Sequence, residues 1–87
     1  MYRLRIVDSA VRDIESLDRS VAKRIRRRLG WLVENFETIR PEALTAELAG
    51  LYKLRVGDYR VVYEALREEQ LLVIHAIGHR REVYRPR

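Results

Sequence analysis

Two stretches rich in β-forming residues flank the dipeptide Gly57-Asp58, and this arrangement constrains the fold more than any other feature of the 87-residue chain. The stretches are 51–56 and 59–66, and they are rich in Val, Leu and Tyr. A glycine at the first central position is typical of a two-residue β-hairpin loop, because that position needs a positive φ. The sequence therefore predicts an antiparallel hairpin in which Val56 faces Tyr59.

The register of this hairpin decides which side chains share a face of the sheet. Opposed residues lie on the same face, so Arg55 faces Arg60, and Lys53 lies beside them. The other face is apolar and aromatic, with Tyr52, Leu54, Val56, Tyr59, Val61 and Tyr63. Like charges opposed on a sheet are destabilising by up to about 1 kcal/mol. A phosphate-binding pocket would account for such a cationic face, and solvated cations with only Glu64 nearby are the alternative.

A third β-rich stretch covers 71–77 and follows a turn expected at Glu68-Glu69. With that turn, Leu72, Ile74 and Ala76 join the apolar face. By the same alternation, Val73, His75 and Ile77 join the cationic face beside Glu64. His75 is more often a packing residue than a catalyst in such a position.

The first half of the chain predicts one strand and two helices. Alternation over 2–7 is typical of a strand, and Asp8 and Ser9 supply N-cap oxygens for a short helix that ends near Asp18. A longer helix begins near Ser20, with a basic run at 23–28 and an apolar stripe of Val21, Ile25, Leu29, Leu32, Val33 and Phe36. Gly30 within it indicates a close packing contact or a bend. Residues 38–50 form a connection that is either a loop or one helical turn.

Composition narrows the class of partner. The chain has 18 Lys and Arg against 13 Asp and Glu, a net charge of +5, which favours an anionic partner: nucleic acid, an anionic membrane or an acidic protein. It has no cysteine and two histidines, so we expect no disulfide, no thiol nucleophile and no bound metal or other cofactor. No apolar run is long enough to span a membrane or to act as a signal peptide. At this length we expect one domain, residues 1–87.

The runs 51–64 (LYKLRVGDYRVVYE) and 77–85 (IGHRREVYR) resemble the RelE/ParE superfamily of bacterial and archaeal toxins. The resemblance implies an α+β fold, a RelE-like compact single domain with the order β-α-α-β-β-β. In that fold an antiparallel, hairpin-rich sheet is covered on one face by two helices.

For activity, the resemblance to RelE-like members implies a metal-independent endoribonuclease that cuts messenger RNA in the ribosomal A site by attack of the ribose 2′-OH. The family's catalytic positions match Lys53, Arg55, Arg60, Arg80 and Tyr84. Lys53 is expected to act as base or proton relay, and Arg55 and Arg60 to stabilise the phosphate and the transition state. Arg80 is expected to stabilise the leaving oxygen or to act as an acid toward it. Tyr84 is expected to stack on or orient a base, or alternatively to close the core. RNA contacts are expected from His79, Arg81, Lys23 and Arg27.

Two other functions remain open on the sequence. ParE-like members share the fold and poison DNA gyrase, and a basic domain can also bind nucleic acid without catalysis. The resemblance further implies an acidic, RelB-like antitoxin that folds on binding. It also implies the 30S A site and mRNA as targets. The lack of cysteine fits a cytoplasmic location, and the lack of long apolar runs favours no membrane partner.

Overall fold

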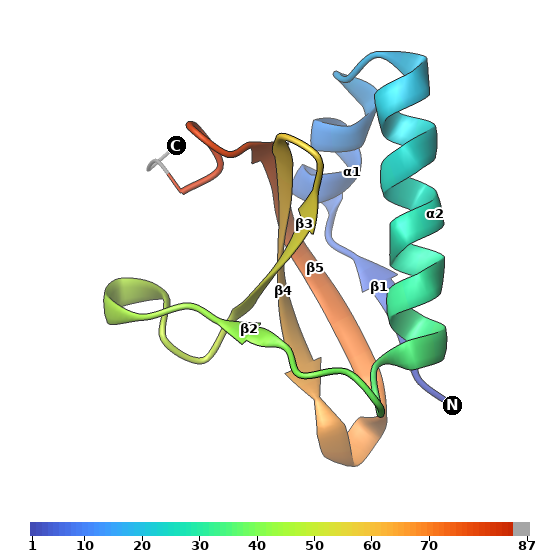
Figure 1. Cartoon of the computed structure of the whole chain (residues 1–87), viewed down its shortest axis with the longest axis vertical. Helices are drawn as coiled ribbons and strands as arrows, with labels where there is room; N and C mark the ends of the chain where they lie inside the picture. The colour runs from blue at the N-terminus through green and yellow to red at the C-terminus, as the bar shows by residue number, and fades with distance from the viewer. Residues whose placement is uncertain (85–87) are drawn as a thin grey trace.

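The computed structural model describes residues 1–84, which form a five-stranded sheet with two helices on one of its faces (Figure 1). In chain order the elements are β1 (Arg3–Ile6), α1 (Asp8–Glu15), α2 (Arg19–Asn35), β2 (Glu42–Ala43), β3 (Tyr52–Val56), β4 (Tyr59–Leu66) and β5 (Leu71–His79). Two 3₁₀ turns, Ala46–Leu48 and Arg67–Glu69, precede β3 and β5. The expected α+β class, with both helices on one face, is confirmed.

The strands lie in the order β1-β5-β4-β3-β2. All neighbours are antiparallel except β1 and β5, which run parallel. The sheet is therefore mixed, and its antiparallel part is the β3–β4–β5 meander that the sequence predicts. The connection after α2 holds a short strand and a 3₁₀ turn, so the expected element order gains β2.

The predicted hairpin register is confirmed. Val56 pairs with Tyr59 and Arg55 pairs with Arg60. Gly57 has a φ of +59°, as the first central residue of this loop requires. A Cβ at Gly57 would also meet the guanidinium of Arg24 on α2, but this flexible end of an exposed side chain can move aside, so the backbone conformation is what demands glycine there.

The register between β4 and β5 shifts at a β-bulge. Tyr63 pairs with Ile74 but Val62 pairs with Ala76, so His75 is the additional residue. Beyond the bulge the two faces exchange, and Ile77 lies in the core with 2% of its surface exposed. The placement of Ala76 on the apolar face and Ile77 on the cationic face was therefore wrong, because strict alternation carries no signal for one extra residue.

The start of α1 also differs from the prediction. Val7 occupies the N-cap position without a side-chain hydrogen bond, and Asp8 lies in the first turn of the helix. Asp8 and Ser9 are therefore not caps. A carboxylate in the first turn is instead favourable to the partial positive charge of the helix N-terminus.

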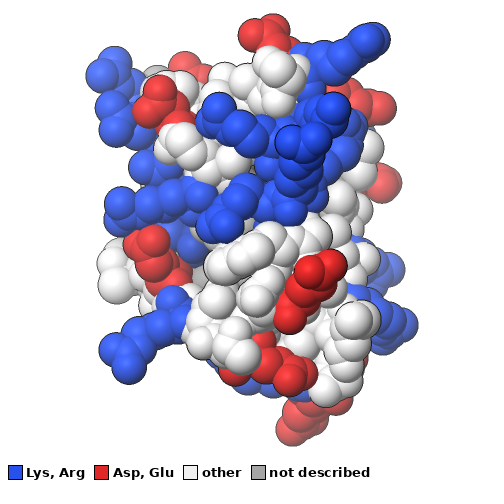
Figure 2. Space-filling model, turned by 45° about the vertical axis from the view of Figure 1, so that its right-hand side comes forward, with Lys and Arg blue, Asp and Glu red and all other residues white. Residues whose placement is uncertain are grey.

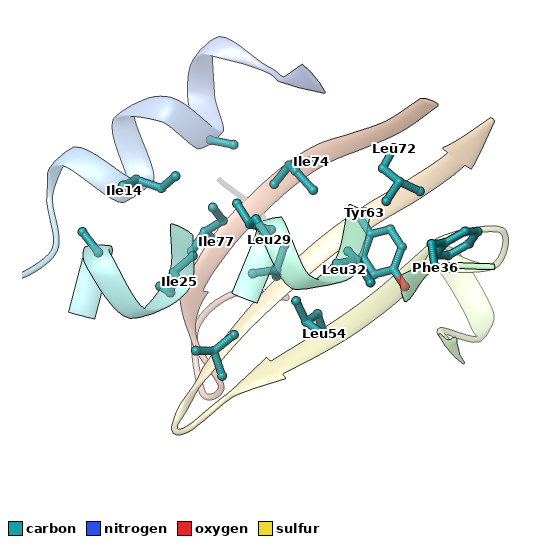
Figure 3. Packing of buried hydrophobic residues seen from close by; sticks show 14 of the residues in the cluster. Ile14, Ile25, Leu29, Leu32, Phe36, Leu54, Tyr63, Leu72, Ile74 and Ile77 are labelled. Atoms are coloured by element: carbon teal, nitrogen blue, oxygen red, sulfur yellow. The ribbon is translucent and has the colours of Figure 1, made fainter. Parts of the chain in front are cut away.

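The core lies between the helices and the sheet (Figure 3). The α2 stripe supplies Ile25, Leu29, Leu32 and Phe36, all buried, whereas Val21 and Val33 are partly buried and Ala22 takes a buried place. The strands supply Leu54, Val56, Val61, Tyr63, Leu72, Ile74 and Ile77. The ring of Tyr63 packs edge-on against that of Phe36, with ring centres 6.3 Å apart.

Replacing Gly30 by Ala is expected to raise the free energy of unfolding by about 0.5–1 kcal/mol, because Ala is the better helix former. A Cβ at Gly30 would have no atom within 4 Å, so the expected close packing contact was wrong and nothing obstructs the methyl group. Urea denaturation of both proteins measures the change. Gly57→Ala is the matched control and should be destabilised, so a loss of stability in Gly30→Ala would contradict this account.

Stability is expected to fall between pH 10 and pH 12 by roughly 2–3 kcal/mol on account of Tyr63. Burial raises the pKa of its hydroxyl from 10.0 to about 12. The unfolded chain therefore loses this proton first, and the stabilisation that is complete below pH 10 is lost as the pH rises to 12. Urea denaturation across this range should show a shallower decline for Tyr63→Phe than for the natural protein, and equal slopes would refute the assignment.

Candidate active site on the open face of the sheet

The face of the sheet away from the helices carries the predicted cations. Lys53 and Arg55 alternate along β3, and Arg60 on β4 is the direct partner of Arg55. Figure 1 shows that the chain after β5 and the loop between β2 and β3 both project on this side. The open face is therefore flanked by two irregular segments, which is a common arrangement for a ligand site.

Glu42 provides an anion for this cluster. It is the cross-strand partner of Lys53, and its Oε2 lies 3.1 Å from Nη2 of Arg55 and 3.8 Å from Nζ of Lys53. Glu64, which the sequence offered for this role, instead pairs with His75, with 3.1 Å between Oε1 and Nε2. Sequence reasoning missed Glu42 because a two-residue strand has no recognisable periodicity.

The guanidinium of Arg60 is held at the end of the hairpin. Its Nη1 donates to the carbonyl oxygens of Gly57 and Tyr59, each at 2.8 Å. An arginine has five N–H donors, so Nε and Nη2 remain for a ligand. Arg60 is thus a positioned cation, in contrast to Arg55, whose side chain is 58% exposed.

The segment after β5 brings Tyr84 to the same cluster. The N–H of Arg80 donates to the Asp58 carbonyl at 2.8 Å, and the N–H of Val83 donates to the His79 carbonyl at 2.9 Å, so the chain turns back at once. Desolvation raises the pKa of the Tyr84 hydroxyl, and the charges of Arg60 and Arg55 act to lower it. Tyr84 is 40% exposed and lies outside the core. Its neighbour Val83 is buried and lies against Gly78.

The other predicted site residues are more dispersed. Arg80 and Arg81 are exposed in the turn after β5. The His79 ring lies edge-on to Tyr59, with ring centres 5.8 Å apart, and its Nδ1 accepts from the N–H of Arg81 at 3.2 Å. Lys23 and Arg27 are exposed on α2, in the other layer, so the structure does not bring them to the open face.

The cluster can bind a phosphate and stabilise negative charge that develops on it. Arg and Lys are the residues that bind phosphate, and fixed cations stabilise an anionic transition state. Within residues 1–84, no group of three or more His, Asp or Glu side chains is placed to hold a metal ion. None of the helices in this part of the chain is long and apolar enough to cross a membrane.

The model of the ParE toxin family of type II toxin–antitoxin systems, parDE, matches residues 4–84. A protein of Escherichia coli described as a RelE-like toxin is 24% identical over 84 residues, which cover 91% of this chain and 83% of the relative.

Solved toxin structures share the fold. The RelBE2 toxin–antitoxin complex of Mycobacterium tuberculosis aligns with a TM-score of 0.81 and 28% identity, covering 90% of this chain and 96% of that one. The isolated Escherichia coli RelE toxin aligns with a TM-score of 0.75 and 18% identity, covering 99% of this chain and 88% of that one. The archaeal RelE–RelB complex of Pyrococcus horikoshii aligns with a TM-score of 0.69 and 25% identity, covering 94% of this chain and 98% of that one. The chain therefore belongs to the ParE toxin family of type II toxin–antitoxin systems, within the RelE/ParE superfamily.

Proposed function

We propose that this toxin cleaves messenger RNA on the ribosome without a metal ion. The observation that carries the proposal is the cationic cluster of Lys53, Arg55 and Arg60 on the face of the sheet that the helices leave open, with Tyr84 beside it. The similarity to RelE toxins supports the same reading.

In the proposed reaction the ribose 2′-oxygen attacks the adjacent phosphorus and the bond from phosphorus to the 5′-oxygen breaks. Lys53 takes the proton of the 2′-OH or relays it to solvent, and the 5′-oxygen takes a proton from solvent as it leaves. Arg55 and Arg60 stabilise the additional charge on the phosphorane, and Arg80 stabilises the leaving oxygen. Tyr84 stacks on a base, as aromatic residues do in single-stranded RNA recognition. His79 and Arg81 contact RNA beside the site, and Lys23 and Arg27 contact ribosomal RNA.

The structure suggests that Glu42 competes with the phosphate for these cations. Glu42→Gln is therefore expected to tighten binding of a non-cleavable single-stranded RNA about 3- to 5-fold at low salt, with a smaller gain at high salt. Fluorescence anisotropy measures the affinity. Glu64→Gln removes the same charge elsewhere on this face and should have a smaller effect. Weaker binding by Glu42→Gln would mean that Glu42 serves only to support the sheet.

The proposed function is tested by adding the purified protein to a reconstituted translation system and mapping mRNA ends by primer extension. We expect cuts within codons in the A site, no cuts in the same RNA without ribosomes, and loss of the cuts with Lys53→Gln. Arg12→Gln removes an exposed cation of α1 and should behave as the natural protein. Intact mRNA and continued translation would refute the proposal.

A second candidate is inhibition of DNA gyrase, and it is favoured by one observation: the family model that matches the chain is that of ParE toxins. Gyrase supercoiling assays with the same preparation separate the two functions. Inhibited supercoiling together with intact mRNA would select this candidate. Nucleic-acid binding without either effect would select a non-enzymatic role.

We propose an acidic antitoxin of the RelB type as the physiological partner of this chain in the cytoplasm. The relatives from Mycobacterium tuberculosis and Pyrococcus horikoshii were solved as toxin–antitoxin complexes. A segment that folds on binding would cover the exposed cations of a chain with a net charge of +5.

A further inference from the structure

A pocket lies at the outer edge of β3, beside the short strand β2 and the residues 39–41 that precede it. β2 pairs with Tyr52 and Lys53 only, so the rest of this edge of β3 has no strand beside it. Residues from both layers line the pocket there, among them Arg28, Trp31, Arg40, Glu42, Lys53 and Arg55. The pocket thus connects α2 to the open face of the sheet.

Trp31 is the feature of this pocket that needs explanation. It is a large aromatic residue with 38% of its surface exposed on α2, outside the core cluster. The guanidinium of Arg28 lies 4.1 Å from the centre of its ring, a cation–π contact. Figure 2 shows that Lys and Arg gather in a band on this side of the molecule, next to surface formed by uncharged residues.

The chemistry of the pocket matches that of single-stranded nucleic-acid sites. Such sites combine cations that follow the phosphates with an aromatic ring on which a base stacks. Here the cations are Arg28 and Arg40, and the ring is that of Trp31. A small or apolar ligand would not need three arginines and a lysine around one indole.

The pocket is continuous with the proposed catalytic cluster. Lys53 and Arg55 belong to both, because they lie on β3 in the cationic cluster and also line the pocket. An RNA strand whose phosphate is bound by these two residues therefore reaches the pocket by passing around the edge of β3.

We propose that this pocket is a subsite for one nucleotide of the single-stranded RNA bound at the open face. Its base stacks on the ring of Trp31, on the face opposite Arg28 or in place of that guanidinium, and its phosphate lies between Arg28 and Arg40. The inference rests on the proposed function in one respect: the strand that enters the pocket is the one held by Lys53 and Arg55.

Trp31 is the one tryptophan of the chain, so its fluorescence reports directly on the pocket. The experiment titrates the full chain with a 2′-O-methyl single-stranded RNA heptamer and follows Trp31 emission and the anisotropy of a labelled heptamer. We expect quenching of Trp31 at the same RNA concentration as the anisotropy change. An abasic heptamer should bind more weakly and leave the emission unchanged.

Variants separate stacking from charge. Trp31→Ala should weaken binding about tenfold and Trp31→Phe should restore most of it, because a base can stack on either ring. Arg28→Gln should also weaken binding, whereas Arg26→Gln, which removes an exposed cation of α2 outside the pocket, should change it less.

Several results would overturn the inference. Heptamer binding with constant Trp31 emission and an unaffected Trp31→Ala affinity would place the RNA elsewhere, and absence of heptamer binding would remove the subsite altogether. If Trp31 emission changed when an antitoxin bound but not when RNA was added, this surface would be a protein interface. None of these results decides the proposed function, which depends on the mapped mRNA ends.

Discussion

Arg60→Ala is expected to lower the rate of mRNA cleavage about 100- to 1,000-fold, the usual loss when one fixed donor to a developing oxyanion is removed. Arg60 is chosen because its guanidinium is already positioned by the carbonyl oxygens of Gly57 and Tyr59. No reorganisation of this cation is needed when charge develops on the phosphorane. Quantified primer extension in the reconstituted translation system measures the rate.

The conservative variant Arg60→Lys separates charge from geometry. An ammonium keeps the positive charge but lacks the planar fork, so it cannot donate to the hairpin and to a phosphate in the same way. We expect Arg60→Lys to recover only part of the lost activity. Circular dichroism and urea denaturation must show both variants folded, and Arg12→Gln is the charge control. Cleavage within threefold of the natural rate by folded Arg60→Ala would remove Arg60 from the mechanism.

The position of the cationic cluster was predictable because a short sequence motif, the loop dipeptide Gly57-Asp58, determines which residues face each other. Gly57-Asp58 sets the loop length, the loop length sets the register, and the register places Arg55 opposite Arg60. Glu42 and the Trp31 pocket carry no such signal. Their partners lie on β3 and are brought close only by the tertiary fold.

The fold, too, has parts that follow from local sequence and parts that depend on contacts between distant segments. The β3–β4 hairpin and the two helices follow from turn residues and periodicity. The hairpin occurs where the sequence predicts it, α2 begins within one residue of the prediction, and α1 ends at Glu15 instead of near Asp18. The parallel pairing of β1 with β5 joins segments at opposite ends of the chain, so no local pattern indicates it. The bulge at His75 moved Ile77 into the core because packing against the helices outweighs strict alternation.

Leu29→Ala is expected to lower the free energy of unfolding by about 3 kcal/mol, within the range for a buried leucine that leaves a cavity. Leu29 is 1% exposed and lies in the middle of the α2 stripe, between Ile25 and Leu32 (Figure 3). A domain of this size has a total stability of roughly 4–13 kcal/mol. The midpoint of thermal unfolding should therefore fall by about 12–24 °C. Urea and thermal denaturation measure both quantities.

Val11→Ala is the matched control, because Val11 lies on α1 with 38% of its surface exposed and is outside the core cluster. Its stability should stay within about 0.5 kcal/mol of the natural protein. If Leu29→Ala cost no more than Val11→Ala, α2 would not be packed on the sheet as described. An antitoxin that binds only the folded toxin should restore thermal stability to Leu29→Ala in proportion to the logarithm of its concentration. A loss of toxicity in Leu29→Ala would then reflect a smaller fraction of folded protein. The loss in Arg60→Ala would instead reflect slower cleavage by a folded protein.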